Sequence, residues 1–245
     1  MSIAVVMPAY NEEEGLLGFL TELNLHLCDW QPEFIVINDV STDGTRDAVE
    51  SIRAMGIKCK VITNEKNLGH GPSTLRALKE GLETGCDYVL AIDGDGQFLG
   101  ADVAKLVETM NSGNYEVVEG VRCHRGGPLY RRVVSLATRT LVQTRARMRP
   151  TDANTPLRIY QPKTLHALLS IIPDNASTPN LLISAITRRQ GIRYTEVNVE
   201  SIPRRGTDIG GSTWKAKTKI LPSKRFIIFC ASAARQWFTT PLSKK

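Results

Sequence analysis

Two aspartates, Asp93 and Asp95, are the residues of this sequence with the clearest capacity for chemistry. They follow directly after the apolar run 88–92, within the segment 93–97. Side chains at i and i+2 of an extended backbone point to the same side, so both carboxylates would lie together at the end of a strand. A cation between them relieves their repulsion, and Mg²⁺ or Mn²⁺ often takes one or two carboxylates together with phosphate oxygens. The spacing predicts a divalent cation carrying a diphosphate; a polar turn that caps the strand is the alternative.

A block of arginines is the second set of residues that could bind a substrate. Residues 121–158 contain nine arginines, no lysine and one acid, Asp152. Arginine is preferred where planar phosphate or carboxylate oxygens are bound, so the block favours an anionic ligand. A solvated basic face and nonspecific nucleic-acid affinity are the alternatives. Aromatic side chains that would stack on bases are scarce in this block, so we expect no nucleic-acid partner.

Alternating strands and helices must position these residues. Apolar, often β-branched runs predict strands at 3–7, 34–37, 60–63 and 88–92, and helices are expected at 12–27, with Asn11 as N-cap, at 45–55 and at 69–83. This alternation indicates a parallel, doubly wound α/β sheet, in which ligands bind outside the carboxyl ends of the strands. The polar segments 8–11, 38–43 and 93–97 all follow such ends, so we expect them to meet at one edge.

Composition limits the class of protein. Of the 245 residues, 42% are hydrophobic and 23% are charged, which is ordinary for a globular domain. The five cysteines are scattered without metal-type spacing and are interpreted as reduced thiols, which favours a cytoplasmic protein. The sequence predicts neither a signal peptide nor a membrane-spanning helix.

The C-terminal segment carries the excess basic charge. Residues 209–245 hold eight Lys or Arg and no acid, against a net charge of +6 for the whole chain, and residues 223–238 predict a helix with several aromatic and aliphatic side chains. A basic amphipathic segment suits an anionic membrane surface, such as the inner face of the cytoplasmic membrane. Packing on the core or on a second subunit is the alternative. We expect a main domain over 1–212, with halves 1–120 and 121–212, and an extension over 213–245.

Four motifs together resemble the family 2 inverting glycosyltransferases. They are Pro8-Ala9-Tyr10-Asn11-Glu12, the segment 38–45, Asn67-Leu68-Gly69 and Asp93-Gly94-Asp95-Gly96-Gln97, whose order and spacing match over about residues 3–125. Within that family the chain is similar to the dolichyl- and polyprenyl-phosphate hexose synthases, also through segments 118–122, 129–132 and 204–212. The resemblance implies a GT-A fold, that is, a Rossmann-like α/β fold with a mostly parallel sheet.

The resemblance also implies an activity and a role for each motif residue. The activity is metal-dependent, inverting transfer of a hexose from a UDP- or GDP-sugar to a polyprenyl-phosphate-type lipid. The donor would be bound by Pro8, Tyr10, Glu12, Asp39, Asp93 and Gly94. Asp93, Asp95 and Gln97 would hold Mg²⁺ or Mn²⁺. The acceptor phosphate and the diphosphate would be bound by Arg122, Arg131, Arg132, Arg204, Arg205 and Ser212. The expected catalytic set is Asp93, Asp95, Arg122 and Asp152.

Two other functions stay open from the sequence. Asp152 can orient an acceptor, pair with an arginine, or act as a base, and in the last case the acceptor would be a saccharide or another hydroxyl compound. A non-catalytic sugar-nucleotide-binding protein is the alternative from another class. A nucleotidyltransferase is disfavoured because residues 8–11 lack the Gly-rich basic loop that such enzymes place after the first strand.

Overall fold

The structure is a computed structural model that describes residues 1–123, 129–206 and 224–242. Its centre is a seven-stranded sheet with strand order β3-β2-β1-β4-β6-β5-β7. The strands are β1 (Ile3–Ala9), β2 (Pro32–Asn38), β3 (Cys59–Thr63), β4 (Tyr88–Ala91), β5 (Val117–Arg122), β6 (Arg158–Tyr160) and β7 (Tyr194–Val199). Only β6 runs antiparallel to its neighbours, β4 and β5. The predicted mostly parallel α/β sheet is therefore confirmed.

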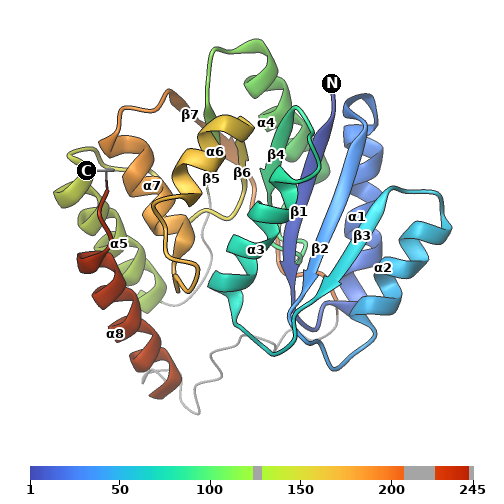
Figure 1. Ribbon diagram of the computed structural model, residues 1–245, viewed down its shortest axis with the longest axis horizontal. Coiled ribbons are helices and arrows are strands. Elements are labelled where there is room, and N and C mark those ends of the chain that lie inside the picture. Colours follow the sequence, from blue (N-terminus) through green and yellow to red (C-terminus); the bar gives the residue numbers. More distant parts are fainter. Residues whose placement is uncertain (124–128, 207–223, 243–245) are drawn as a thin grey trace.

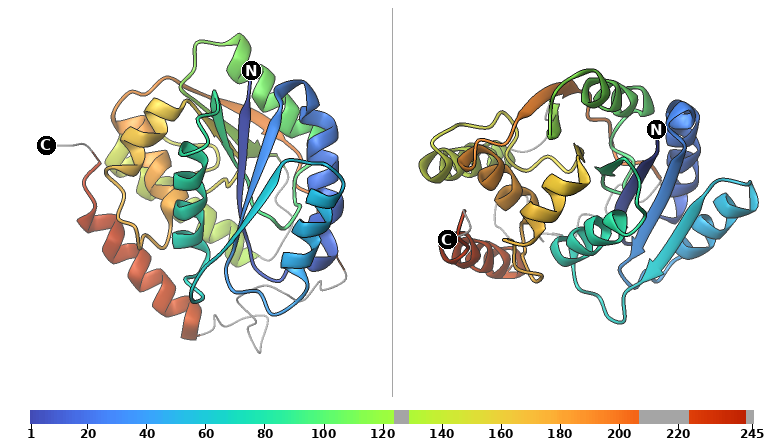
Figure 2. Two further views of the ribbon diagram at one scale, coloured as in Figure 1. Left: turned by 45° about the vertical axis from the view of Figure 1, so that its right-hand side comes forward. Right: turned by 45° about the horizontal axis from the view of Figure 1, so that its top comes forward.

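Helices cover both faces of this sheet (Figures 1 and 2). They are α1 (Glu13–Leu27), α2 (Thr45–Ala54), α3 (His70–Leu82), α4 (Gly100–Ser112), α5 (Leu129–Ala146), α6 (Pro162–Leu169), α7 (Pro179–Arg189) and α8 (Lys224–Thr239), with a short 3-10 helix, η1 (Cys28–Trp30). One buried cluster joins α1, α2 and α4 to the sheet, and a second joins α3, α5, α6, α7 and α8 to its other face. The layers follow the doubly wound pattern that the sequence predicts.

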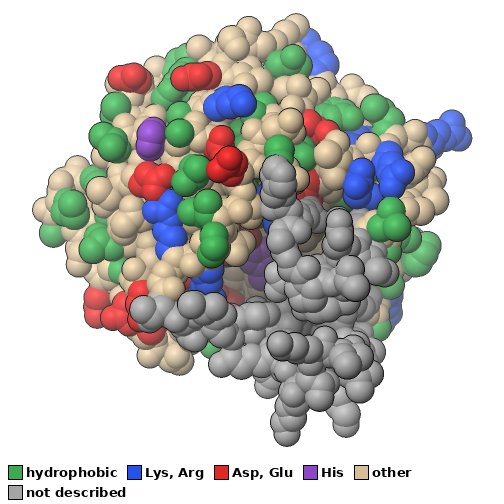
Figure 3. Space-filling model, turned by 180° about the vertical axis from the view of Figure 1, so that it is seen from behind, with side chains coloured by type: hydrophobic (Ala, Val, Ile, Leu, Met, Phe, Trp, Pro, Cys, Tyr) green, Lys and Arg blue, Asp and Glu red, His purple; other side chains and the backbone are tan. Residues whose placement is uncertain are grey.

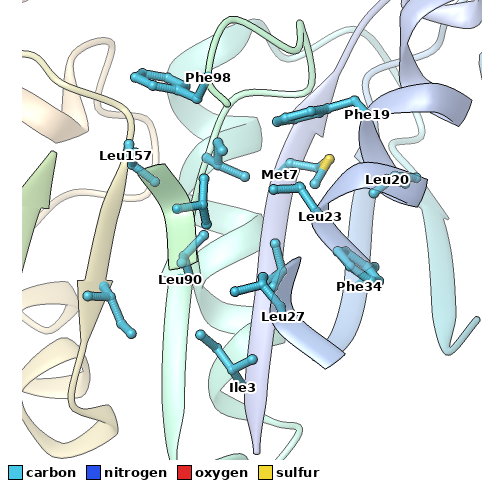
Figure 4. Close-up of a cluster of buried hydrophobic side chains, with 14 of the residues drawn as sticks. Ile3, Met7, Phe19, Leu20, Leu23, Leu27, Phe34, Leu90, Phe98 and Leu157 are labelled. Carbon is cyan, nitrogen blue, oxygen red and sulfur yellow. The ribbon is translucent and has the colours of Figure 1, made fainter. Parts of the chain in front are cut away.

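Side-chain alternation along β1 connects the two layers. Ile3, Val5 and Met7 face the α1 side, whereas Ala4 and Val6 face the α3 side. Figure 4 shows the first of these clusters, with Met7 and Phe34 of the sheet against leucines of α1. Burying each of the larger side chains (Ile, Leu, Val, Met and Phe) stabilises the fold by about 1.5–3 kcal/mol. The central strands thus form a rigid support for the loops at their carboxyl ends.

The expected elements of the first 92 residues are present with small shifts of their ends, but the predicted helix cap is wrong. The residue that precedes α1 is Glu12, whose own side chain makes no capping hydrogen bond; the amide of Glu13 donates instead to Asp43 at 3.2 Å. Asn11 has a φ of 54° and its side-chain oxygen accepts a hydrogen bond from the amide of Thr42 at 2.9 Å. Its amide oxygen therefore joins two strand-end loops instead of capping a helix.

The predicted C-terminal helix is also present, as α8, and its last turns pack on the core. Trp237 is buried, with 2% of its surface exposed, and the guanidinium of Arg145 lies 5.1 Å from the centre of its ring. Arg145 also donates hydrogen bonds to the carbonyls of Trp237 and Thr240, so α5 holds the end of α8. Among the described helices, none is long and apolar enough to span a bilayer. The predicted boundary near residue 212 lies outside the described residues, and membrane contact stays a prediction.

Candidate functional site

The loops after β1, β2 and β4 meet at one edge of the sheet, as predicted. The amide of Asp39 donates to the carbonyl of Ala9 at 3.0 Å, and the amide of Gly94 donates to the carbonyl of Pro8 at 3.2 Å. A Cβ on Gly94 would lie 3.0 Å from that same Pro8 oxygen, so this close approach favours glycine. This edge is the place where parallel α/β sheets bind ligands.

Asp39, the predicted nucleoside-binding residue, is held by three donors. Its Oδ1 accepts from the side-chain amide of Asn64 at 2.7 Å and from the amide of Leu68 at 2.8 Å, and its Oδ2 accepts from the amide of Gly69 at 2.8 Å. A carboxylate has about four lone-pair positions, so one further donor can be bound. The motif Asn67-Leu68-Gly69 thus holds Asp39 through two backbone amides and through the side chain of Asn67, which donates to the carbonyl of Asp39 at 3.0 Å.

Ser41 and Asp43 shape the neighbouring turn. The hydroxyl of Ser41 accepts from the amide of Asn11 at 3.0 Å, and Asp43 accepts from the amide of Thr45 at 3.1 Å. Asn64, which was not singled out from the sequence, bonds Asp39 and also accepts from Arg76 at 2.6 Å. Its position at the carboxyl end of β3 is the signal that could have identified it.

Three acidic side chains lie where β1 and β4 end, namely those of Glu12, Asp93 and Asp95. Burial, with a contribution from the charge of Asp93, raises the pKa of Asp95 to about 6. Burial also raises the pKa of Glu12 to about 7, and the nearby Arg204 opposes that change. Such shifts mean that negative charge at this edge is poorly solvated and needs a positive partner.

The donor set at this edge fits part of a divalent-cation site. Asp93 and Asp95 supply carboxylate oxygens and Gln97 an amide oxygen, the hard ligands that Mg²⁺ and Mn²⁺ take. Among the described residues, no group of three His, Cys, Asp or Glu side chains is arranged to hold a metal by itself. A cation here would take its remaining ligands from water or from a bound ligand with suitable oxygens, such as a diphosphate.

The segment 201–206 lies across the loop that carries these aspartates. The amide of Ile202 donates to the carbonyl of Gln97 at 3.0 Å, and the amide of Arg205 donates to the carbonyl of Asp95 at 3.2 Å. The side chain of Arg205 pairs with Glu22 at 2.5 Å and donates to the carbonyl of Gly96 at 3.0 Å. This segment therefore fixes the backbone of the acidic loop.

Arg204 and Arg205, expected to bind phosphate, both have carboxylate partners in the structure. Arg204 pairs with Glu12 at 2.7 Å and donates to the carbonyl of Asn11 at 2.7 Å. Arg205 also lies over the ring of Phe19, with its central carbon 5.1 Å from the ring centre. Phosphate binding by these arginines stays a prediction, and the geometry gives them a structural role.

On the other side of the acidic loop, Arg122 at the end of β5 pairs with Asp152. Its Nε donates to Oδ2 at 2.7 Å and its Nη2 donates to Oδ1 at 3.3 Å and to the carbonyl of Asn154 at 3.3 Å. Burial lowers the pKa of Arg122, and the carboxylates of Asp93 and Asp95 oppose this change. The guanidinium thus lies within electrostatic reach of the acidic loop, and the structure unites Arg122, Asp152, Asp93 and Asp95 in one region.

A buried charge cluster supports the loop that carries Asp152. Glu119 pairs with Arg158 at 3.1 Å and with Arg188 at 2.7 Å, and Arg188 also pairs with Glu196 at 2.8 Å. Glu196 accepts from the amide of Thr151 at 3.1 Å, and Arg158 donates to the carbonyl of Ala153 at 3.3 Å. This cluster was not predicted from the sequence. A glutamate inside the apolar strand 117–121 was its available signal.

The remaining predicted site residues have different positions. Tyr10 is 41% exposed at the end of β1, and Pro8 and Gly94 lie beside it at the same edge. Arg131 and Arg132 lie in the first turn of α5, and their side chains are outside the described part of the structure. Ser212 lies outside the described residues altogether.

The molecular surface bears on the expected partners. Figure 3 shows acidic and basic side chains interspersed over the described part of one face. Such mixing is typical of a solvated surface and differs from the one-sign groove that tracks a nucleic-acid backbone. The absence of a nucleic-acid partner stays a prediction.

Comparison with known proteins supplies independent information. The family model described as "Glycosyl transferase family 2" matches residues 4–187. The chain is 26% identical over 183 residues to a UDP-N-acetylglucosamine–dolichyl-phosphate N-acetylglucosaminyltransferase from Methanococcus voltae, covering 68% of this chain and 72% of that protein. It is 27% identical over 212 residues to an undecaprenyl-phosphate mannosyltransferase from Micrococcus luteus, covering 83% and 85%.

A solved structure has the same fold. Glucosyl-3-phosphoglycerate synthase from Mycobacterium tuberculosis, crystallised with Mn²⁺, UDP-glucose and glycerol 3-phosphate, superimposes with a TM-score of 0.61 at 22% identity. The match covers 84% of this chain and 73% of that one. At this identity the likeness concerns the fold, and it agrees with the predicted GT-A architecture.

Proposed function

The chain belongs to glycosyl transferase family 2, and we propose that it transfers a hexose from a UDP- or GDP-sugar to the phosphate of a polyprenyl-phosphate-type lipid. The two relatives described above are named for transfer to dolichyl phosphate and undecaprenyl phosphate, which supports a lipid phosphate as acceptor. The reaction forms a bond from an acceptor phosphate oxygen to the anomeric carbon. It breaks the bond from that carbon to the diphosphate, with inversion.

The donor half of the proposal rests on the edge formed by β1, β2 and β4. Asp39 has capacity for one more donor, and both uracil and guanine carry a suitable ring N–H. Asp93, Asp95 and Gln97 would hold Mg²⁺ or Mn²⁺, which as a Lewis acid would neutralise the departing diphosphate. Glu12 and Tyr10 would line the nucleoside side of the same edge.

The observation that carries the acceptor assignment is the ion pair between Arg122 and Asp152. The Asp152 side chain is 1% exposed, and both of its oxygens accept hydrogen bonds from the guanidinium of Arg122. It is therefore poorly arranged to take a proton from a hydroxyl. A phosphate monoester is already ionised near neutral pH and needs cationic positioning more than a base. Arg122, oriented by Asp152, would bind the acceptor phosphate close to the acidic loop.

The experiment is product analysis with the full chain. Polyprenyl phosphate in detergent micelles is incubated with UDP-glucose, UDP-N-acetylglucosamine or GDP-mannose and Mg²⁺ or Mn²⁺, and lipid-linked sugar is measured by mass spectrometry. We expect a lipid-phosphate hexose with one donor class and its loss in Asp95→Ala. The control is Asp174→Ala, an exposed aspartate whose side chain pairs with Lys79 on the surface.

Two outcomes would overturn this assignment. Glycosylation of soluble saccharides with no lipid product would favour the hydroxyl-acceptor alternative with Asp152 as base. Near wild-type turnover by Asp95→Ala would show that the acidic loop is not needed for catalysis. Sedimentation of the active protein with anionic vesicles would test the proposed peripheral contact with the membrane.

A further inference from the structure

His70 is a polar side chain at the edge of the candidate site to which the motifs assign no role. It is the first residue of α3, and its Nε2 lies 3.6 Å from Oδ1 of Asp93. The imidazole is 56% exposed and the side chain of Asp93 is 25% exposed, so both face accessible space. The two groups come from different elements and meet beside the acidic loop.

The position of His70 is fixed by its surroundings. The two residues before it, Leu68 and Gly69, donate their amides to Asp39. The residue after it, Gly71, lies so close to the 176–177 backbone that a Cβ would come within 2.3 Å of the carbonyl oxygen of Ala176. The start of α3 is therefore held on both sides, which fixes the backbone of His70 beside the acidic loop.

The separation of the two groups indicates what they could bind together. At 3.6 Å the imidazole and the carboxylate are too far apart for a good hydrogen bond to each other. A hydroxyl can donate to the carboxylate and accept from the imidazole N–H at the same time. An ionised phosphate oxygen only accepts, and the carboxylate would repel it.

We propose that one hydroxyl of the transferred hexose contacts both His70 and Asp93 from their accessible side, which makes His70 a specificity-determining residue. The inference rests on the proposed function, because it needs a sugar nucleotide at the acidic loop. It assigns the diphosphate to the Asp95 side of that loop and the sugar to the α3 side. His70 therefore contributes to the choice of sugar and leaves the binding of the nucleoside diphosphate unchanged.

Calorimetry on three variants tests the proposal. His70→Ala removes the donor, His70→Gln keeps an N–H near the position of Nε2, and His166→Ala removes an exposed histidine from α6 as the matched control. Each protein is titrated with Mn²⁺, with UDP or GDP, and with the sugar nucleotide that the wild type turns over. We expect His70→Ala to lower the affinity for the sugar nucleotide roughly 5- to 20-fold, because one hydrogen bond is lost. The affinity for the nucleoside diphosphate should be unchanged. His70→Gln should recover part of the loss.

Deoxyfluoro donors identify the hydroxyl. The analogue that lacks the bound hydroxyl should bind wild type and His70→Ala with equal affinity, whereas the other analogues should keep the difference. The proposal is overturned if His70→Ala lowers Mn²⁺ or nucleoside-diphosphate affinity to the same extent, because His70 would then bind the cation or the diphosphate. It is also overturned if all affinities match those of His166→Ala.

Failure of the function itself has a different signature. In that case the wild type would transfer no hexose. The Asp95→Ala variant would also bind every sugar nucleotide with the same affinity as the wild type. If only the His70 inference fails, wild-type transfer and the Asp95→Ala defect remain. Thermal melts of each variant establish that folding is retained.

Discussion

Arg122 and Asp152 form a two-point ion pair that joins β5 to the loop before β6. The shorter contact, from Nε to Oδ2, is 2.7 Å, and the Asp152 side chain is 1% exposed. The pair holds the planar guanidinium in one orientation near the acidic loop, as bidentate geometry does.

We expect Asp152→Asn to lower kcat/KM for polyprenyl phosphate by about 100-fold, because a small displacement of a positioning group has effects of this order. The measurement is initial rate against acceptor concentration at saturating donor. Donor affinity, measured by calorimetry, should stay within about twofold of the wild type. Unchanged kcat/KM for the lipid phosphate would show that Asp152 does not position Arg122 for catalysis.

Glu119 should be a major determinant of stability, because it is the shared partner of two buried arginines. Its side chain and those of Arg158 and Arg188 are all 0% exposed. Glu119→Gln would leave buried positive charge uncompensated, so we expect a loss of about 3–5 kcal/mol in the free energy of unfolding. The measurement is urea unfolding.

Glu50→Gln is the matched control for that change. Glu50 pairs with Arg53 across one turn of α2, and the two side chains are 44% and 56% exposed. Exposed pairs contribute little, so its effect should stay within about 0.5 kcal/mol. Equal effects of the two substitutions would contradict a structural role for the buried cluster.

The raised pKa of Glu12 predicts how stability depends on pH. Its folded-state pKa of about 7 exceeds the ordinary value of 4.5, mainly because of burial. Between these values the folded protein binds a proton that the unfolded chain has released, so the free energy of unfolding falls as pH rises through this window. A shift of this size corresponds to roughly 3 kcal/mol when the window is crossed completely.

Glu12→Gln should flatten that decline, since glutamine has no charge to bury. Urea unfolding without divalent cations at pH 5 and at pH 8 measures the difference, and Glu65→Gln, at an exposed position, should retain the wild-type slope. An unchanged slope in Glu12→Gln would mean that other carboxyls, such as Asp95, cause the dependence.

Truncation of two adjacent aromatic residues of α8 should have effects of very different size on stability. Trp237 is 2% exposed and Phe238 is 71% exposed. Trp237→Ala removes a large side chain from the second core cluster, and we expect a loss of about 3–5 kcal/mol together with faster amide exchange in α8. Phe238→Ala should change stability by less than about 0.5 kcal/mol. Similar small effects of both would mean that the end of α8 is not anchored on the core in solution.

The sequence alone was sufficient to predict the first four strands, the helices between them and the position of the acidic loop. Apolar periodicity and turn residues are local properties, and segments 3–7, 34–37, 60–63 and 88–92 each show them clearly. The meeting of the loops after β1, β2 and β4 also followed, because the carboxyl ends of parallel strands share one edge. Asn11 shows the limit of such reasoning, since its φ of 54° depends on a partner loop about 30 residues away.

Only the tertiary structure decided which charged groups meet. Arg204 reaches Glu12 across 192 residues, and Arg188 reaches Glu119 across 69. The three-residue strand β6, which places the Asp152 loop beside Arg122, is too short to leave a periodic signal. Partners so distant in the chain become neighbours through the packing of the whole sheet, and no local pattern of residue types specifies them.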